Sequence, residues 1–489
     1  MLRALLAALL VAALFAGCTS SDAGKPGALG VNPDQSLLLP GHAKLGLAAG
    51  PALWDDPQNT PHPKWDWPTL SHPPANGTGP SWWTPVPAKE LPGHITGITH
   101  VAQAMDGSTP VRQGAGIAIF GHVVVVPEDR EFAHFVDVSD PAHPREVGKV
   151  ESTGRGAAVI AYPTGRVVTA ISTSPGFDVI DFTDPAKPEV IAQVKPTEGG
   201  HKLGVVPGTP ILYNAGSSGG EPLPNPAYGP GLCNVSISEC TGYTSIYNLT
   251  DPAHPVLVQE FRNGLACHHI FFWNNPAQDK FRAICAGIQY TQLWDTADPE
   301  HPKVIVSLPV HLGVPGTPSA MLSIEDFSHS AGLNTKGDVL YVGDENNGGG
   351  GSALGAGPGP TGCYAGTESP QGNAGTPVGA TWFYDVSDEQ NPRLLGYFAP
   401  PRDASHNAPR TCTTHHGRIV PDREGRDLLA MSYYQDGVIL IDFSNIKLGT
   451  LPKVVGEYND GSDTWETWYD QGYLFTGDLA RGMDVLTFT

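Results

Sequence analysis

The chain has 489 residues, of which 28 are Lys or Arg and 49 are Asp or Glu, so its formal net charge is −21. This charge argues against nucleic-acid binding, because phosphate contacts need a basic face. The 59 glycines and 47 prolines indicate many turns, and the 40% of hydrophobic residues supply enough apolar material for a large core.

The first eighteen residues (1–18) resemble an export signal. Arg3 gives a basic start, residues 4–16 form an apolar run, and Leu-Phe-Ala-Gly then leads into Cys18. The run is too short to span a membrane as a helix. The LFAGC segment resembles a bacterial lipobox, which implies that Cys18 is lipidated; an ordinary cleaved signal peptide with an incidental cysteine is the alternative. We therefore expect an extracytoplasmic protein, lipid-anchored to the cell envelope and attached to the membrane through that anchor only.

A segment rich in Pro, Gly and Ser follows at residues 19–92, and it holds five of the ten tryptophans. A solvated tether would not normally carry so many large aromatic side chains. We expect residues 19–50 to be a flexible spacer and residues 51–92 to be an extended arm, stiffened by proline and held on the folded domain by its tryptophans.

One pattern recurs beyond residue 110: an alternating apolar strand ends in Asp-Val/Phe-Ser/Thr-Asp-Pro-x-x-Pro and is followed by a short second strand. Four copies of this pattern begin at Phe135, Val179, Ile246 and Leu293, and two looser copies begin at Phe383 and Leu440. A seventh begins at Met483 and stops where the turn should begin. Two further β-type runs precede each copy, so each unit has four strands, A to D. Seven such units predict an all-β fold, a seven-bladed β-propeller of four-stranded blades over residues 93–489.

The repeats resemble those of bacterial LVIVD-repeat β-propeller proteins, over roughly residues 110–488. This resemblance implies the fold and says little about activity, because the repeat is structural. The Asp residues of the turn are expected to cap it with their side chains. The last unit has no strand D after Phe488, and we expect residues 94–101 to fill that slot and close the ring.

Two of the units are longer than the others. The extra length comes from inserts rich in Gly and Pro at residues 217–242 and 345–380, between strands B and C of units three and five. Strand B is antiparallel to strand A, so its end lies on the same face as the start of strand A. The inserts should therefore overhang the starts of the inner strands.

Histidine occupies one equivalent position at the start of strand A in four consecutive units, at His201, His268, His329 and His415. The other three units carry Ala115, Ala157 and Thr464 there. This position is the axial end of the innermost strand, so the imidazoles can point at a common centre. Three or four neutral imidazoles suit a transition metal. The sequence thus predicts one transition-metal ion, Cu, Fe or Zn, on the propeller axis.

Further candidates lie at the same end of the inner strands, which we call the rim. His269 and His416 follow two of the predicted ligands, and strand alternation is expected to turn them away from the axis or into a second layer around the metal. A nearby carboxylate from Glu325, Asp326 or Glu466 can orient a ligand histidine or act as a general base. The same reasoning extends to other residues at this end: Asp344, Glu345, Asp478, Tyr433 and Tyr434. Taken singly, each acid also fits a solvated loop.

Six cysteines remain after Cys18, and an even count in an exported chain favours disulfides. We expect the pairs Cys233–Cys240, Cys267–Cys285 and Cys363–Cys412, which would tie the inserts to the histidine-bearing rim. Thiolate ligation of a metal by Cys267 or Cys412 is the alternative.

These features lead to competing functions. The first is a metalloprotein, an oxidase, oxygenase or lyase acting on a small molecule beneath the inserts. The second is a non-catalytic cell-surface binding or scaffold propeller whose histidines are structural, since propeller loops suit partner binding. A third is metal storage or delivery. The sequence contains no P-loop or H-E-x-x-H motif.

Overall fold

The structure is a computed structural model. It describes the following residues: 60–65, 67–71, 79–105, 116–128, 131–173, 176–195, 201–215, 243–262, 267–287, 290–309, 328–345, 379–398, 400, 413–447, 450 and 452–489. All of them belong to one compact unit, Leu45–Thr489. The expected signal peptide, Cys18, the spacer and nearly all of both inserts lie outside the described residues. None of the helices in the described part has the length and apolar character needed to cross a membrane.

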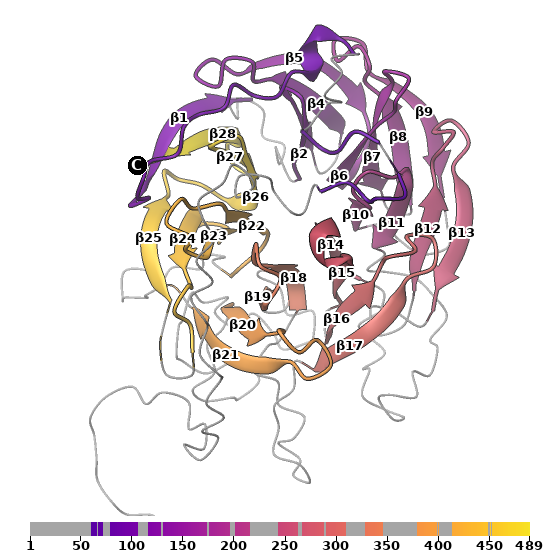
Figure 1. The fold of residues 1–489 in the computed structure, drawn as a ribbon. Coiled ribbons are helices and arrows are strands. Elements are labelled where there is room, and N and C mark those ends of the chain that lie inside the picture. Colours follow the sequence, from indigo (N-terminus) through magenta and orange to yellow (C-terminus); the bar gives the residue numbers. More distant parts are fainter. Residues whose placement is uncertain are drawn as a thin grey trace, which may run out of the picture. The chain divides into compact units, whose positions relative to one another are not determined.

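Seven four-stranded antiparallel sheets surround a central axis, as the sequence predicts (Figure 1). Blade 1 consists of β2 (Ala118–Phe120), β3 (Val123–Pro127), β4 (Phe132–Asp137) and β5 (Arg145–Glu151). Blade 2 consists of β6 (Gly154–Ala161), β7 (Val167–Thr173), β8 (Phe177–Asp181) and β9 (Glu189–Val194). Blade 3 consists of β10 (Lys202–Val205), β11 (Ile211–Ala215), β12 (Thr244–Asn248) and β13 (Val256–Phe261). Blade 4 consists of β14 (His269–Asn275), β15 (Lys280–Ala286), β16 (Tyr290–Asp295) and β17 (Lys303–Pro309), with a 3-10 turn, η5 (Pro276–Gln278), between its first two strands.

The remaining blades repeat this order. Blade 5 consists of β18 (Ser328–Leu333), β19 (Val339–Asp344), β20 (Thr381–Asp385) and β21 (Arg393–Phe398). Blade 6 consists of β22 (Gly417–Val420), β23 (Leu428–Ser432), β24 (Val438–Asp442) and β25 (Lys453–Tyr458). Blade 7 consists of β26 (Thr464–Asp470), β27 (Tyr473–Asp478), β28 (Gly482–Phe488) and β1 (Ile98–Ala104).

Burial follows the position of a strand within its blade. The second strands are largely buried and mainly apolar, and β3 and β11 are buried along their whole length, because neighbouring blades cover both of their faces. The outermost strands, such as β5, carry exposed charged residues. Between the third and fourth strands each blade has a shift in register. This recurrent bulge, which twists the outer strand, is not evident from the sequence repeat.

The Asp-Pro turns have the expected capping geometry. In blade 1, Asp137 Oδ1 accepts a hydrogen bond from the backbone N–H of Ser139 at 2.8 Å, and Asp140 Oδ1 accepts one from Ala142 at 3.1 Å. The equivalent acids of the other turns do the same. These side chains hold the turn and are not available for chemistry.

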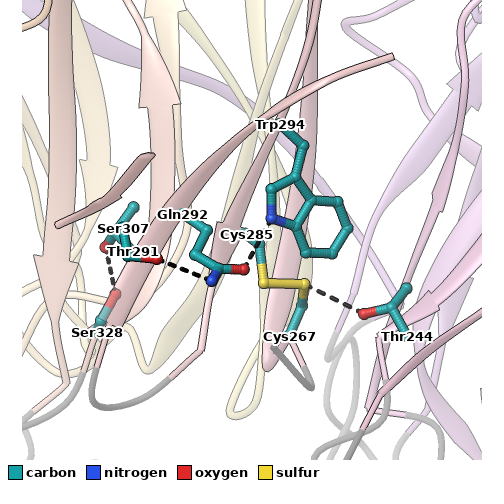
Figure 2. The surroundings of a disulfide bond; sticks show 8 residues. All are labelled: Thr244, Cys267, Cys285, Thr291, Gln292, Trp294, Ser307 and Ser328. Carbon is teal, nitrogen blue, oxygen red and sulfur yellow. Dashed lines mark hydrogen bonds between the residues drawn. A yellow bond between two sulfur atoms is a disulfide. The ribbon is translucent and has the colours of Figure 1, made fainter. Parts of the chain in front are cut away.

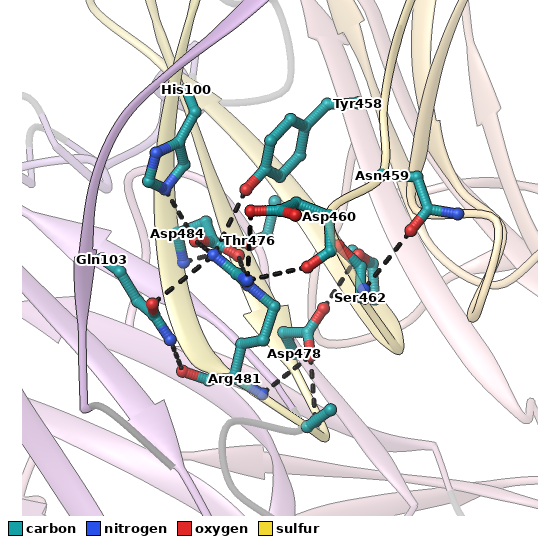
Figure 3. Close-up of polar contacts among 12 residues, drawn as sticks. His100, Gln103, Tyr458, Asn459, Asp460, Ser462, Thr476, Asp478, Arg481 and Asp484 are labelled. Carbon is teal, nitrogen blue, oxygen red and sulfur yellow. Dashed lines mark hydrogen bonds and ion pairs between the residues drawn. The ribbon is translucent and has the colours of Figure 1, made fainter.

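The ring closes through β1, which pairs with the last strand, β28, from Ile98↔Phe488 to Ala104↔Met483. The closing strand therefore starts at Ile98 and ends at Ala104, a few residues later than the expected segment 94–101. We call this pairing of β1 with β28 the closing seam. Asp484 stabilises it, because its carboxylate accepts hydrogen bonds from the Arg481 guanidinium at 3.0 Å and lies 2.9 Å from His100 Nε2 (Figure 3). The N-terminal and C-terminal parts of the chain are joined in one sheet.

The described part of the arm crosses the propeller. His62 donates its backbone N–H to Pro207 O at 2.9 Å, and Ser71 donates its own to Ile119 O at 3.1 Å. The short 3-10 turn η3 (Ser81–Trp83) then places Trp83 edge-on against Phe120, with ring centroids 5.2 Å apart. The tryptophans thus pack on the blades, which offsets the entropy lost by ordering the arm.

The closing seam gives a stability prediction. Asp484→Ala removes a carboxylate with a side chain only 1% exposed and leaves Arg481 without its strongest partner, so we expect a loss of about 3 kcal/mol in the free energy of unfolding, measured by urea denaturation. Asp460→Ala is the control, because Asp460 is 78% exposed beside the same arginine and its loss should cost less than about 1 kcal/mol. Equal losses would show that Asp484 does not hold the seam.

Candidate functional site

The four predicted histidines all lie at the start of an inner strand. His201 and His268 directly precede β10 and β14, His329 is the second residue of β18, and His415 lies two residues before β22. The backbone N–H groups of His201, His268 and His415 make the same bond, to a carbonyl near the end of the second strand of their blade. This shared bond shows that the sequence alignment identified a structurally equivalent position.

The imidazole rings follow one another around the axis. The centroids of His201 and His268 are 3.8 Å apart, those of His268 and His329 are 4.5 Å apart, and those of His329 and His415 are 4.1 Å apart. The first ring lies 6.4 Å from the third. The structure thus brings all four predicted residues together as a curved row.

Two groups of three histidines among the described residues have ligand atoms that all lie within 4.8 Å of one another. The first is His201, His268 and His329, and the second is His329, His415 and His416. His329 belongs to both groups. A third group, Asp298, Glu300 and His301, lies in an exposed Asp-Pro turn whose acids already cap the backbone.

His416 and His269 are not turned away from the cluster, so of the two arrangements expected from strand alternation, only a place in a second layer around the metal stays open as a prediction. The ring of His416 lies 4.2 Å from that of His415 and 4.7 Å from that of His329. The physical reason is that β22 begins only at Gly417, so alternation does not apply to the two residues before it. The ring of His269 lies 4.5 Å from that of His416, which extends the cluster to six imidazoles.

Burial keeps these imidazoles neutral. Removal from water lowers the pKa of His201 to about 3, helped by the positive charges of Arg155 and Lys202. Burial also lowers the pKa of the other five imidazoles well below the usual value, chiefly by the same cause. A neutral imidazole keeps a lone pair for a metal ion, so the electrostatics favour ligation over ion pairing.

Glu345 is the carboxylate that faces the cluster. Its two oxygens lie 3.2 Å from His329 Nε2 and 3.6 Å from His415 Nε2, and Tyr434 donates its hydroxyl proton to the second of these oxygens. On the other edge of its ring, His415 Nδ1 lies 2.5 Å from the carbonyl oxygen of Trp465, which fixes a proton on Nδ1 and leaves Nε2 as the acceptor. Glu345 and Tyr434 were two of several rim candidates in the sequence, and the structure singles them out.

Glu466 lies beside the cluster but is held by cations. Its backbone pairs with His416, while its carboxylate forms a salt bridge with Lys202, accepts the N–H of Ile117 at 3.0 Å and lies 3.7 Å from Arg418. All three charged side chains are buried. Burial lowers the pKa of Lys202, and the neighbouring Glu466 opposes that shift.

Some of the remaining predicted residues lie in the part of the chain that the structure describes, and the others lie outside it. Both Ala157 and Thr464 are buried. Ala157 is the fourth residue of β6, whereas Thr464 is the first residue of β26 and donates its hydroxyl proton to Asp478 at 3.1 Å. Glu325, Asp326 and Ala115 lie outside the described residues, as do Cys233, Cys240, Cys363 and Cys412.

The predicted disulfide Cys267–Cys285 is present, with a sequence separation of 18 residues (Figure 2). It joins the residue before His268 to the second strand of the same blade. Thr244 donates its hydroxyl to Cys267 Sγ at 3.3 Å, and the Trp294 indole packs near the bond. The bond therefore anchors the start of β14, where the histidines stand, and excludes Cys267 as a thiolate ligand.

Lys202, Arg418 and Trp465 are site residues that the sequence reasoning missed. Lys202 and Arg418 occupy inner-strand positions where apolar side chains usually pack, and that departure from the pattern is the signal that could have found them. Trp465 lies with its ring 4.3 Å from that of His415 and 5.4 Å from Lys202 Nζ, and so links the imidazoles to the charged group.

Comparison with known proteins agrees with the repeat. The family model for the LVIVD repeat matches residues 134–152, across the first Asp-Pro turn. The chain contains an LVIVD repeat. No curated protein matches it.

Several solved structures are similar. Sqt1 of Saccharomyces cerevisiae has 12% identity over 77% of this chain and 83% of that one, with a TM-score of 0.44. YCF48 bound to D1 peptide has 10% identity over 83% and 99%, with a TM-score of 0.45. The WD40 β-propeller domain of Doa1 has 9% identity over 80% and 97%, with a TM-score of 0.45. Similarity at this level carries no information on function.

The buried charged group formed by Lys202, Arg418 and Glu466 gives a second stability prediction. Glu466→Ala leaves Lys202 and Arg418 buried without their carboxylate, so we expect a loss of about 3 kcal/mol in the free energy of unfolding, measured by chemical denaturation. Lys202→Met combined with Glu466→Leu should recover much of that loss, because it removes both members of the closest pair. Glu424→Ala, at a 45% exposed ion pair, is the control and should cost less than about 1 kcal/mol. A Glu466→Ala variant as stable as this control would contradict the prediction.

Proposed function

We propose that this chain is an extracytoplasmic, lipid-anchored metalloprotein whose propeller holds one transition-metal ion, Cu, Fe or Zn, at the axial histidine cluster. The ion would serve oxidative or lyase chemistry on a small molecule. The proposed ligands are His201, His268, His329 and His415, with His416 as a further donor in the second group of three.

The strongest support is a set of buried ring nitrogens that have no hydrogen-bond partner in the described part of the chain. Nε2 of His201, Nδ1 of His269 and both ring nitrogens of His416 are buried and make no hydrogen bond within the described part of the chain. Leaving a buried polar atom unpaired costs about 1–3 kcal/mol, so several at one place need a compensating partner. Bonds to a metal ion would supply that compensation.

The donor set fits such an ion. Neutral imidazole suits Cu, Fe and Zn, and three protein ligands with an open position are typical of catalytic sites. Bound there, the ion would polarise a substrate or exchange electrons with it. Among the protein groups, Glu345 can accept a proton or orient His329 and His415, and Tyr434 holds Glu345 in place.

Export is supported by two independent features. Residues 1–18 resemble a lipoprotein leader, and a buried disulfide, Cys267–Cys285, is typical of an oxidising compartment. Mass spectrometry of the mature N-terminus would test the leader directly, because lipidation adds a defined mass to Cys18.

The metal is tested by inductively coupled plasma mass spectrometry on exported protein without a histidine tag. We expect stoichiometric Cu, Fe or Zn in the parent chain. His329→Ala should abolish it, because His329 belongs to both groups of three, and the His268→Ala/His415→Ala double variant should do the same by breaking each group.

The matched control is His254→Ala combined with His301→Ala, since these histidines are exposed in Asp-Pro turns. The control should retain the metal of the parent. A parent chain that is metal-free and takes up none on reconstitution would overturn the proposal and leave a binding or scaffold propeller with structural histidines.

A further inference from the structure

A cavity of about 70 Å³ lies along the inner strands next to the histidine cluster. His269 is part of its wall, so the cavity adjoins the six imidazoles. β6, β10, β14, β22 and β26 supply most of the lining. Arm residues Pro68, Thr69 and Leu70 and the turn between β10 and β11 (residues 207–209) supply the rest. The proposed metal site leaves this space unexplained.

The charged groups of the lining do not balance. They are two cations, Lys202 and Arg418, and one carboxylate, Glu466. These residues are 3%, 5% and 0% exposed, so water compensates the excess positive charge poorly. An uncompensated buried charge is costly, and an anion bound in the cavity would offset it.

Arg418 is the side chain poised to bind that anion. Its guanidinium lies between two aromatic rings, 4.7 Å from the centroid of Phe271 and 4.0 Å from that of Trp468, which fixes its plane. Within the described part of the chain it makes one hydrogen bond, from Nη1 to Gly417 O at 3.2 Å, and its Nη2 lies 3.7 Å from Glu466 Oε1. Arginine donors fixed in this way match the two oxygens of a carboxylate.

Most of the rest of the wall is apolar. Ile270, Phe272, Val159 and Leu203 are among the lining residues, whereas Thr69, Thr209 and His269 are its other polar members. A site with a few fixed polar groups among apolar side chains is typical of small-molecule recognition. The ligand that matches it has one anionic head and an apolar body.

We propose that this cavity binds a small organic monocarboxylate, with its carboxylate on Arg418 and Lys202 and its apolar body against β10 and β14 under the arm. This assignment rests on the proposed function in one respect, because it makes such an acid the substrate class of the adjoining metal site. Binding in the cavity itself does not require the metal.

The experiment is isothermal titration calorimetry of the mature chain with propionate and with propionamide, its uncharged counterpart of the same shape, in a buffer free of other carboxylates. Propionate is chosen because its size suits a cavity of about 70 Å³. Metal-depleted and metal-loaded protein are both titrated. We expect propionate to bind at least tenfold more tightly than propionamide in both forms. Arg418→Gln should weaken propionate binding at least tenfold, whereas Arg145→Gln, at an exposed arginine on β5, should leave it unchanged.

Leu70→Trp provides a second variant that leaves every charge in place and fills the cavity from the arm side, and it should abolish binding. Equal affinity for the two compounds, no binding of either, or propionate binding that survives Arg418→Gln or Leu70→Trp would overturn the proposal. Binding by the metal-loaded form alone would do so too, since the carboxylate would then bind the metal. Loss of the metal site with propionate binding intact would overturn only the proposed function.

Discussion

Closure of the ring is the constraint on which the rest of the structure depends. Pairing of β1 with β28 turns seven independent sheets into a circle, and a circle forces the first residues of all inner strands toward one axis. Polar side chains from different blades then meet in a place that water scarcely reaches. They must satisfy one another or bind something else, and this is why we place the proposed site at the axis rather than in the Asp-Pro turns, whose acids are already used by the backbone.

The repeat made the fold predictable, because one exact or loose copy of the strand pattern per unit gives the number of blades, and the missing last strand requires a partner from an earlier segment of the chain. The same register located His201, His268, His329 and His415. It could not place His416, because alternation applies only inside a strand and β22 begins one residue later. The bulge in each blade was also hidden, since it arises from twist in the sheet and leaves no fixed residue type behind.

The charged group beside the cluster shows a different limit of sequence reasoning. The pattern can indicate that Lys202 and Arg418 face inward, but only the closed ring reveals that both meet Glu466, a residue more than 250 positions from Lys202. In the sequence Glu466 is a candidate catalytic acid, but in the structure its carboxylate is the counter-ion of Lys202 and Arg418. Glu345, by contrast, stands at the end of β19 and faces two imidazoles, so position relative to the axis distinguishes two acids that look alike in sequence.

The histidine cluster and the charged group of Lys202, Arg418 and Glu466 are coupled through electrostatics. Positive charge on Lys202 disfavours a second positive charge on the nearby rings, and it contributes, after burial, to the lowered pKa of His201, His269 and His415. Trp465 packs against both His415 and Lys202 and fills the space between the cluster and the charged group. The cations therefore have two effects: they add to the effect of burial in lowering the pKa of the imidazoles, and they leave an excess of positive charge in the adjoining cavity. A substrate that brings its own negative charge would complete the electrostatic balance only when it is bound, which would join recognition of the acid to the chemistry of the metal.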